Sequence, residues 1–222
     1  INQRDGFFLV SRKPAESWQW TDLEGSTLIP VGFTPVPIMS LKAAMKRRGV
    51  SIDKVRFIEG LSAEDALARF RNRDADYIHL PNPQAQELVQ EGAGFIATPV
   101  GIDLGYICYS SFAATPEFIE SRPETVQKFV NGFYKAQKWL AVSEVSDIAV
   151  RATPLFPGID RAVITASIRS YKDLQTWADD PLIGEDGYDA MRDLIIEGGL
   201  VRTRAPYERL VRPEFAMRAM AE

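Results

Sequence analysis

The residue types that most often carry out catalysis are scarce in this sequence. Cys108 is the only cysteine and His79 the only histidine among 222 residues. A single cysteine excludes an intramolecular disulfide and a cysteine-rich metal cluster, and a single histidine excludes a multi-histidine metal site. A Ser-His-Asp triad would need His79 as its base. These residues favour binding over catalysis, and we expect no catalytic residue, no metal and no other cofactor.

The first candidate binding loop contains Gly32, Phe33 and Thr34. Thr34 precedes a predicted helix, where a hydroxyl and free backbone N–H groups can hold an anionic or polar ligand group. The alternative is a plain helix cap. Pro35 and Pro37 lack an N–H group and so weaken an anion site. We therefore expect Phe33 to pack on an organic ligand.

The second candidate loop follows a predicted strand at residues 76–80. His79 lies in this strand and Asn82 lies just beyond it. Ligands of open α/β sheets gather beyond the carboxyl ends of the strands, so both residues are candidates for ligand contact. Asn82 is the stronger one, because a solitary histidine in a strand is more often a satisfied core or edge residue than a ligand contact.

Three further residues are candidates for ligand contact. Arg12 can pair with a carboxylate, sulfonate or phosphate group of a ligand in the cleft. The alternative interpretation is that Arg12 is a solvated residue at the rim. Trp18 can close over a flat ligand, or pack with Trp20 where the chain crosses between lobes. Tyr106 lies in a predicted strand at residues 104–109, one side of which should belong to the core. The predicted cleft has the two loops on one side and Arg12 and Tyr106 on the other.

The elements that must position these residues alternate in the first half of the chain. Apolar runs predict strands at residues 7–10, 27–31, 55–58, 76–80, 95–99 and 104–109, with helices between several of them. This alternation predicts a mostly parallel sheet. The second half predicts helices at residues 123–142, 144–152, 159–177, 187–196 and 213–220.

Composition excludes two classes of partner. The chain is 45% hydrophobic and 25% charged, which is typical of a globular protein with a sizeable core. Its formal net charge is -4 and its basic residues are scattered, so we expect no nucleic-acid surface. Its apolar runs are far shorter than the roughly 20 residues that a membrane span requires, so we expect no direct membrane insertion.

Several segments, taken in order, resemble one known family. The landmarks are residues 8–12, 22–25, 32–34, 74–77, 92–94, 121–126 and 198–201. They resemble the nitrate, sulfonate and taurine type of substrate-binding protein, which serves ABC importers. The resemblance covers nearly the whole chain and rests on the order and spacing of motifs that are individually weak.

The resemblance implies an α/β, two-lobed fold of the periplasmic-binding-protein type (type II), with parallel-rich sheets and a helical C-terminal half. Residues 1–22 would be a remnant of lobe I with the first crossing, residues 23–100 would be lobe II, and residues 101–222 would return to lobe I. A small anion or a related heterocyclic solute would bind between the lobes. The implied partners are that solute and the membrane permease of an importer, and the implied location is periplasmic or otherwise extracytoplasmic.

The resemblance also shows one departure and one alternative. Family members begin with a strand-helix-strand portion of lobe I that this sequence does not contain, so we expect part of the ligand wall to be absent. The family resemblance extends to a fungal enzyme of thiamine-pyrimidine synthesis and to a bacterial desulfinase with a cysteine nucleophile. The sequence has no cysteine-rich run like the fungal enzyme's, and Cys108 does not match the desulfinase cysteine. An enzyme of this fold remains the alternative to a binding protein.

Overall fold

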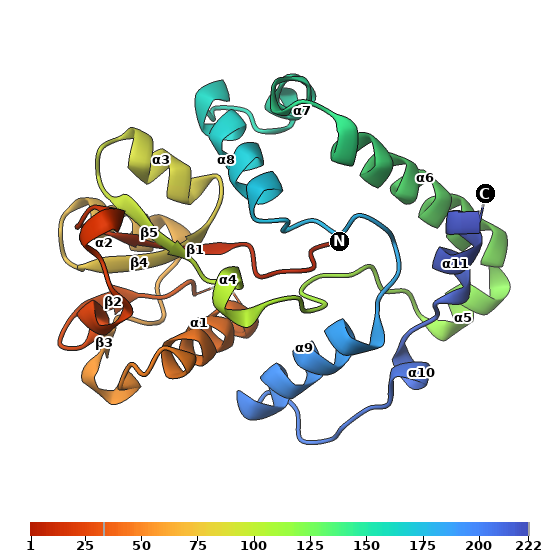
Figure 1. Cartoon of the computed structure of the whole chain (residues 1–222), viewed down its shortest axis with the longest axis horizontal. Helices are drawn as coiled ribbons and strands as arrows, with labels where there is room; N and C mark the ends of the chain where they lie inside the picture. The colour runs from red at the N-terminus through yellow and green to blue at the C-terminus, as the bar shows by residue number, and fades with distance from the viewer. Residues whose placement is uncertain (33, 222) are drawn as a thin grey trace.

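The computed structural model describes residues 1–32 and 34–221. Within these residues the strands form one five-stranded sheet with the order β3-β2-β4-β1-β5 (Figure 1). The strands are β1 (Phe7–Ser11), β2 (Thr27–Ile29), β3 (Arg56–Phe57), β4 (Tyr77–Pro81) and β5 (Phe95–Pro99).

Strand β1 occupies an inner position of the sheet and runs against both of its neighbours. Its register pairs Phe7 with Pro81 of β4 and Phe8 with Pro99 of β5. All five of its residues are buried. The prediction that residues 7–10 belong to the other lobe is therefore wrong. An apolar run that is buried on both faces needs strand partners on both edges, and an inner position of the sheet supplies them.

The sheet is mixed rather than mostly parallel. Strand β2 pairs in parallel with β3 and β4, as the alternation of strands and helices predicts. Strand β1 pairs antiparallel with β4 and with β5, and these two pairings complete the sheet. Residues 104–109 form no strand, because α4 (Gly101–Leu104) occupies their start.

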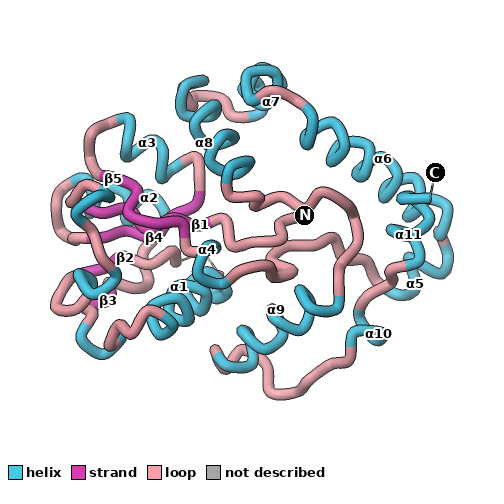
Figure 2. Tube along the Cα trace, viewed as in Figure 1, coloured by secondary structure: helices cyan, strands magenta, loops and turns pink. Residues whose placement is uncertain are grey.

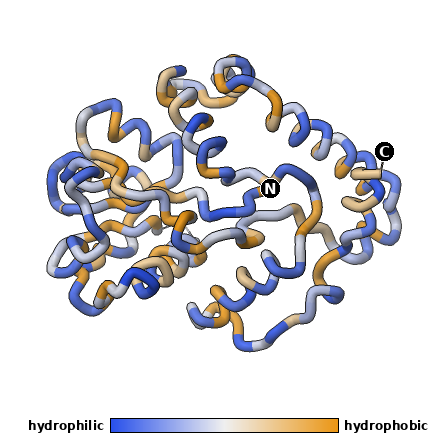
Figure 3. The backbone as a smooth tube through the Cα atoms, viewed as in Figure 1, coloured by the Kyte–Doolittle hydropathy of each residue, from blue (hydrophilic) through white to orange (hydrophobic). Residues whose placement is uncertain are grey.

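Helices cover both faces of the sheet. On one face α1 (Pro35–Arg47) packs Leu41 and Met45 against Leu9 and Leu28. On the other face α2 (Ala63–Arg71) and α3 (Gln84–Gln90) cover Phe8 and the remaining strand residues. Figure 3 shows hydrophobic segments gathered along the strands of this half.

The second half of the chain is helical, as predicted. Its helices form an open ring beside the sheet (Figure 2). They are α5 (Pro116–Ser121), α6 (Pro123–Val142), α7 (Val145–Ala152), α8 (Arg161–Asp173), α9 (Glu185–Glu197), α10 (Tyr207–Leu210) and α11 (Glu214–Ala221). None of the helices in the described residues is long and apolar enough to cross a membrane.

The apolar face predicted for α6 is only partly covered. Phe129 remains 49% exposed and Trp139 remains 36% exposed. The Phe129 ring meets the ring of Phe112, also exposed, at a centroid distance of 4.7 Å. Two polar residues of α6, Gln127 and Gln137, are instead buried.

Two chain segments connect the sheet to the helical half, and they lie side by side. We call residues 1–6 and 100–110 the crossings. Ile107 donates its N–H to the Gln3 carbonyl over 3.0 Å, and Tyr109 donates to the Asn2 carbonyl over 3.0 Å. The prediction of a crossing near Val100 agrees with this arrangement. The prediction of a crossing near Trp18 is wrong, because Trp18 follows β1 and packs on Trp20 at a ring distance of 5.3 Å.

The crossings touch where Gly101 meets Asp5. A Cβ on Gly101 would lie 2.3 Å from the Asp5 carbonyl oxygen, which is far inside van der Waals contact. We expect Gly101→Ala to lower the free energy of unfolding by about 1 to 3 kcal/mol, because the backbones must separate. Urea denaturation measures this change.

Gly132 in α6 provides a matched control. Apart from its chain neighbours and the backbone of α6, no described atom lies within 4 Å of a Cβ built at Gly132, and alanine is favoured inside a helix. Gly132→Ala should therefore raise stability by up to about 1 kcal/mol. Equal effects of the two substitutions would contradict the close contact between the crossings.

Candidate functional site

The two predicted binding loops lie at the same end of the sheet. Because β2 and β4 are parallel, their carboxyl ends lie together, and the register places Phe7, the start of β1, beside Pro81, the end of β4. We call this end of the sheet the crossing edge, since both crossings join the sheet there. Gly32 follows β2 and Asn82 follows β4, so both loops border the crossing edge, as expected for an open α/β sheet.

The loop after β2 is held close to the loop before α2. A Cβ on Gly32 would lie 2.5 Å from the Leu61 carbonyl oxygen, so this position requires glycine. Thr34 directly precedes α1, and its side chain makes no capping hydrogen bond. Thr34 thus occupies the cap position that the alternative foresaw, but its hydroxyl does not cap the helix. Phe33 lies outside the described residues.

Asn82 offers unpartnered polar atoms at the crossing edge. Its backbone N–H donates to the Tyr171 hydroxyl over 3.1 Å, and that hydroxyl donates to the Gly6 carbonyl over 3.2 Å. The side-chain Oδ1 and Nδ2 of Asn82 are both buried, without a hydrogen-bond partner among the described residues. One side chain of α8 thus fixes the backbone of Asn82 and leaves its amide group available.

His79 is fully buried on the α1 face of the sheet. Its ring lies 5.2 Å from the Phe7 ring, and neither ring nitrogen has a partner among the described residues. Burial lowers the pKa of His79 to about 3, so the imidazole is neutral at physiological pH. The alternative interpretation, that His79 is a core residue, is correct. Its ring nitrogens, however, lack the hydrogen bonds that a buried histidine is expected to make.

Arg12 and Trp18 lie at the opposite end of the sheet from the crossing edge. Arg12 follows Ser11, which pairs with the first residue of β4. Its guanidinium donates to the carbonyls of Phe70, Ala75 and Ala93 and stacks over the Phe70 ring at 3.7 Å. The structure therefore does not bring Arg12 or Trp18 together with the binding loops, because residues 11–20 leave β1 at its far end.

Tyr106 lies in the second crossing and is 54% exposed. Its hydroxyl donates to Gln175 Oε1 over 3.0 Å, and the Arg4 guanidinium stacks over its ring at 4.1 Å. Tyr106 therefore lies at the junction of the two halves with its hydroxyl already bonded, and its predicted ligand contact stays a prediction.

Three polar residues that sequence reasoning missed face one another at the crossing edge. Asp5 is 2% exposed, and its Oδ1 accepts from the Phe7 N–H over 2.7 Å. The hydroxyls of Ser40 and Tyr109 face the same carboxyl, although Asp5 Oδ2 completes no hydrogen bond with them. No local sequence pattern marks these residues, because they come from α1 and from the two crossings.

Burial dominates the electrostatics of Asp5. It raises the pKa of Asp5 from 3.8 to about 7, against smaller lowering effects of the Phe7 N–H and of the Ser40 and Tyr109 hydroxyls. Burial likewise raises the pKa of the Tyr109 hydroxyl above its usual range. The site thus holds a carboxyl group whose charged form is poorly solvated.

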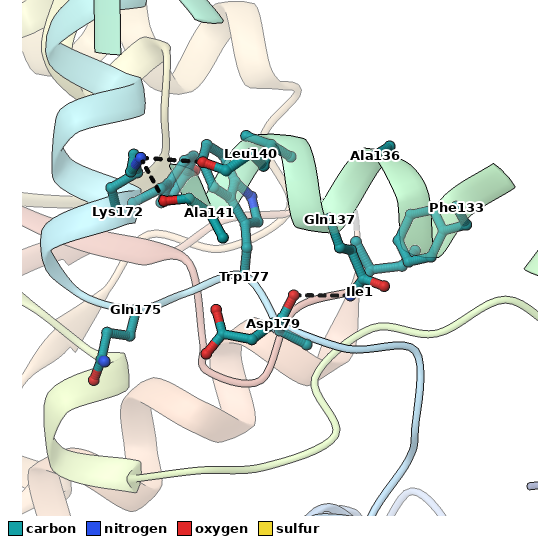
Figure 4. Close-up of a pocket in the computed structure, with 12 residues that line it drawn as sticks. Ile1, Phe133, Ala136, Gln137, Leu140, Ala141, Lys172, Gln175, Trp177 and Asp179 are labelled. Atoms are coloured by element: carbon teal, nitrogen blue, oxygen red, sulfur yellow. Dashed lines mark hydrogen bonds between the residues drawn. The ribbon is translucent and has the colours of Figure 1, made fainter. Parts of the chain in front are cut away.

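Two hollows border elements that adjoin the crossing edge, since the first is lined by Ile1 and Tyr171 and the second by Pro35. A cavity of about 300 Å³ lies between α6 and α8, lined by Phe133, Gln137, Leu140, Lys172, Trp177 and Asp179 among others (Figure 4). Lys172 there donates to three carbonyls at the end of α6, those of Leu140, Ala141 and Ser143. A groove of about 410 Å³ runs between α1 and α9. Among the predicted contact residues that the structure describes, none lines either hollow.

The described residues contain no group of three or more His, Cys, Asp or Glu side chains that would hold a metal ion. Cys108 is half-buried, and burial raises the pKa of its thiol. A raised pKa leaves the thiol protonated and weakly nucleophilic.

The Asp5 pKa predicts a pH dependence of stability. The native carboxyl keeps its proton up to about pH 7, whereas the unfolded carboxyl loses it near pH 3.8. The Asp5 contribution to stability is therefore greatest below pH 3.8 and falls as the pH rises to about 7. Asp5→Asn should stabilise the protein more at pH 8 than at pH 5, by at most about 3 kcal/mol. Urea unfolding at both pH values measures this, and equal gains at the two pH values would contradict the assignment.

Comparisons with known proteins agree with the geometry. The candidate binding protein YtlA of Bacillus subtilis (strain 168) is 27% identical over 223 residues, which cover 100% of this chain and 67% of YtlA. The ligand-binding component of an ABC-type import system from Staphylococcus aureus, solved with zinc bound, matches with a TM-score of 0.72 and 14% identity, over 98% of this chain and 72% of that chain.

Two further solved structures have the same fold. The periplasmic aliphatic sulphonate binding protein SsuA of Escherichia coli matches with a TM-score of 0.71 and 15% identity, over 98% of this chain and 72% of that chain. The desulfurization enzyme DszB matches with a TM-score of 0.64 and 14% identity, over 99% of this chain and 79% of that chain. These matches confirm the predicted fold class.

A family model matches more than half of the sequence. The model described as the NMT1-like family matches residues 26–153, which span both binding loops, the second crossing, α6 and α7. This match takes in more than half of the chain, and the chain therefore belongs to the NMT1-like family.

Proposed function

We propose that this chain is the solute-binding component of an ABC importer and holds a small molecule at the crossing edge. The observation that carries the proposal is the set of buried polar side-chain atoms without partners at the carboxyl ends of β2 and β4, beside both crossings. Open α/β sheets place their ligands at such ends. Side chains that recognise a ligand are expected to lack protein partners while the ligand is absent.

The relatives support this proposal. YtlA is a candidate binding protein, the Staphylococcus aureus relative is a ligand-binding component of an import system, and SsuA is a periplasmic sulphonate binding protein. On this basis the partners of the chain are a small solute and a membrane permease. An importer captures its solute outside the cytoplasmic membrane, so the proposed location is extracytoplasmic.

Catalysis is the second candidate function, because the desulfurization enzyme DszB has the same fold. A nucleophilic mechanism would require an ionised thiol or a base beside a hydroxyl. Burial raises the pKa of Cys108 and lowers that of His79, so neither side chain is prepared for such a role. The proposal is therefore a binding function without turnover.

Native mass spectrometry of the purified protein tests the proposed function. We expect a small molecule that co-purifies in a 1:1 ratio, is released on unfolding and rebinds unchanged. Incubation of the released molecule with the protein, followed by mass analysis, separates binding from catalysis. A molecule that is converted to a product during incubation would favour the enzyme alternative.

Substitution at the two ends of the sheet tests where the solute binds. Asn82→Ala should weaken binding about tenfold, because the solute loses a hydrogen bond. Its effect on stability should be small, since the amide group has no described protein partner. Calorimetric titration with the co-purified molecule measures the affinity.

Arg12→Met is the matched control. It removes three hydrogen bonds to carbonyls and a stacked ring contact, so we expect a loss of stability of about 2 kcal/mol with unchanged affinity. A loss of affinity in Arg12→Met, with none in Asn82→Ala, would place the site at the other end of the sheet.

A further inference from the structure

Four residues bring unpartnered polar atoms together beneath the crossings. We call Asp5, Ser40, His79 and Tyr109 the crossing cluster. Within the described residues, Asp5 Oδ2, Ser40 Oγ, the Tyr109 hydroxyl and both His79 ring nitrogens are buried without a hydrogen-bond partner. Native proteins rarely leave even one such atom unsatisfied, so a concentration of them at one place requires a cause.

The topology explains why these residues meet. Tyr77 and Leu9 belong to the core beneath α1, and His79 lies on the same face because strand side chains alternate. Ser40 comes from α1 above that face. Asp5 and Tyr109 come from the two crossings, and the Phe7 ring lies 5.2 Å from the His79 ring and 6.2 Å from the Tyr109 ring. The cluster is therefore built from four separate elements.

The crossing cluster combines one carboxyl group with hydroxyl and imidazole groups that both donate and accept hydrogen bonds, and it contains no cationic side chain. Asp5 forms no ion pair with a described basic side chain, and the groups that shift its pKa, besides burial, are one N–H and two hydroxyls. His79 is neutral, and Pro35 and Pro37 remove two N–H donors from the start of α1. Arg12 is committed to carbonyls at the far end of the sheet. The cluster itself contains no cationic side chain to balance the charge of an oxyanion; the neighbouring Arg4, whose Nε is buried without a described partner, stacks over the Tyr106 ring.

We propose that the crossing cluster recognises a nitrogen group that donates hydrogen bonds, namely a protonated amine or an amidinium, through Asp5 Oδ2. This proposal rests on the proposed binding function and names the class of solute. The solute nitrogen supplies the partner that the buried carboxylate lacks, and charge-assisted hydrogen bonds of this kind are among the strongest in proteins. The Phe7 and Tyr109 rings supply aromatic faces for the same cation.

The assignment disfavours an anion, which is one of the two solute classes that the resemblance implies, and leaves the other, a heterocyclic solute. At pH 8, where Asp5 is ionised, a sulfonate or nitrate would bring a second negative charge next to it in a poorly solvated place. Tyr109 is partly exposed although its hydroxyl is buried, and the proposal has the solute group enter beside this residue. The chain therefore shares the fold of SsuA but differs from it in the charge of the solute.

Two probes of matched size test the proposal. Benzamidine carries an amidinium, and benzenesulfonate carries an oxyanion on the same ring. We expect calorimetric titration at pH 8 to show 1:1 binding of benzamidine and no binding of benzenesulfonate. Asp5→Asn should weaken benzamidine binding by about tenfold or more, because the ion pair is lost. Tyr109→Phe, which keeps the ring, should weaken it about threefold through loss of one hydroxyl.

The matched control is Asp179→Asn. Asp179 is an exposed carboxylate that lines the cavity between α6 and α8 (Figure 4). Its substitution removes the same charge from the other plausible cation site, and we expect benzamidine affinity to remain unchanged. The melting temperature of each variant establishes that it is folded before titration.

The affinity of benzamidine should also rise between pH 5.5 and pH 8, since the amidinium stays protonated while Asp5 ionises near pH 7. The other titratable groups facing Asp5 are Tyr109 and Tyr171, whose pKa values burial raises. The neutral His79 packs on the Phe7 ring, which also lies near Tyr109. None of these groups changes charge in that pH range.

Several results would overturn the proposal. Binding of benzenesulfonate without benzamidine would reject a nitrogen donor and leave the proposed binding function standing. Benzamidine binding that survives Asp5→Asn, or is lost in Asp179→Asn, would move the site to the α6–α8 cavity. Absence of benzamidine binding also rejects the proposal. Failure of the proposed function is a separate outcome, namely turnover of the co-purified molecule.

Discussion

The antiparallel insertion of β1 between β4 and β5 determines where everything else lies. A strand at an inner position of a sheet must bury both faces and hydrogen-bond on both edges, which the apolar residues of β1 satisfy. Because β1 runs against β4, the chain enters the sheet at the end where β2 and β4 finish. Because β5 also runs against β1, the chain leaves the sheet at that end. The crossings and the binding loops therefore share one edge.

Local signals in the sequence predicted local structure well. The Ser62 hydroxyl caps α2 by accepting the Asp65 N–H, and Gly49, with a positive φ of 75°, follows the end of α1. These features depend on residues only three or four positions apart. Most of the helices in both halves could be located from such signals, together with the loops that follow β2 and β4.

Features that depend on distant residues were not predicted. The position of β1 depends on strands about seventy and ninety residues later, and nothing in its own residues distinguishes an inner strand from one in another lobe. Arginine is a residue type that often binds anions, but the Arg12 guanidinium donates hydrogen bonds to backbone carbonyls of three separate segments. Asp5 carries no motif, because its environment is made by α1 and by the second crossing. The candidate site could be located by loop position, while the charge it offers to a ligand could not.

The pairing of the two crossings has a consequence for the order of folding. The Asn2 N–H donates to Ser110 Oγ across 108 residues, and the Gln3 side chain donates to the Trp177 carbonyl across 174 residues. Contacts of such sequence separation form only after the entropy of a long loop has been overcome, and they slow folding. During synthesis, residues 7–11 emerge well before β4 and β5, so β1 must wait as an unpaired apolar segment. The sheet core can close only when β5 has appeared, and the crossings can be completed only when the residues after α8 have left the ribosome.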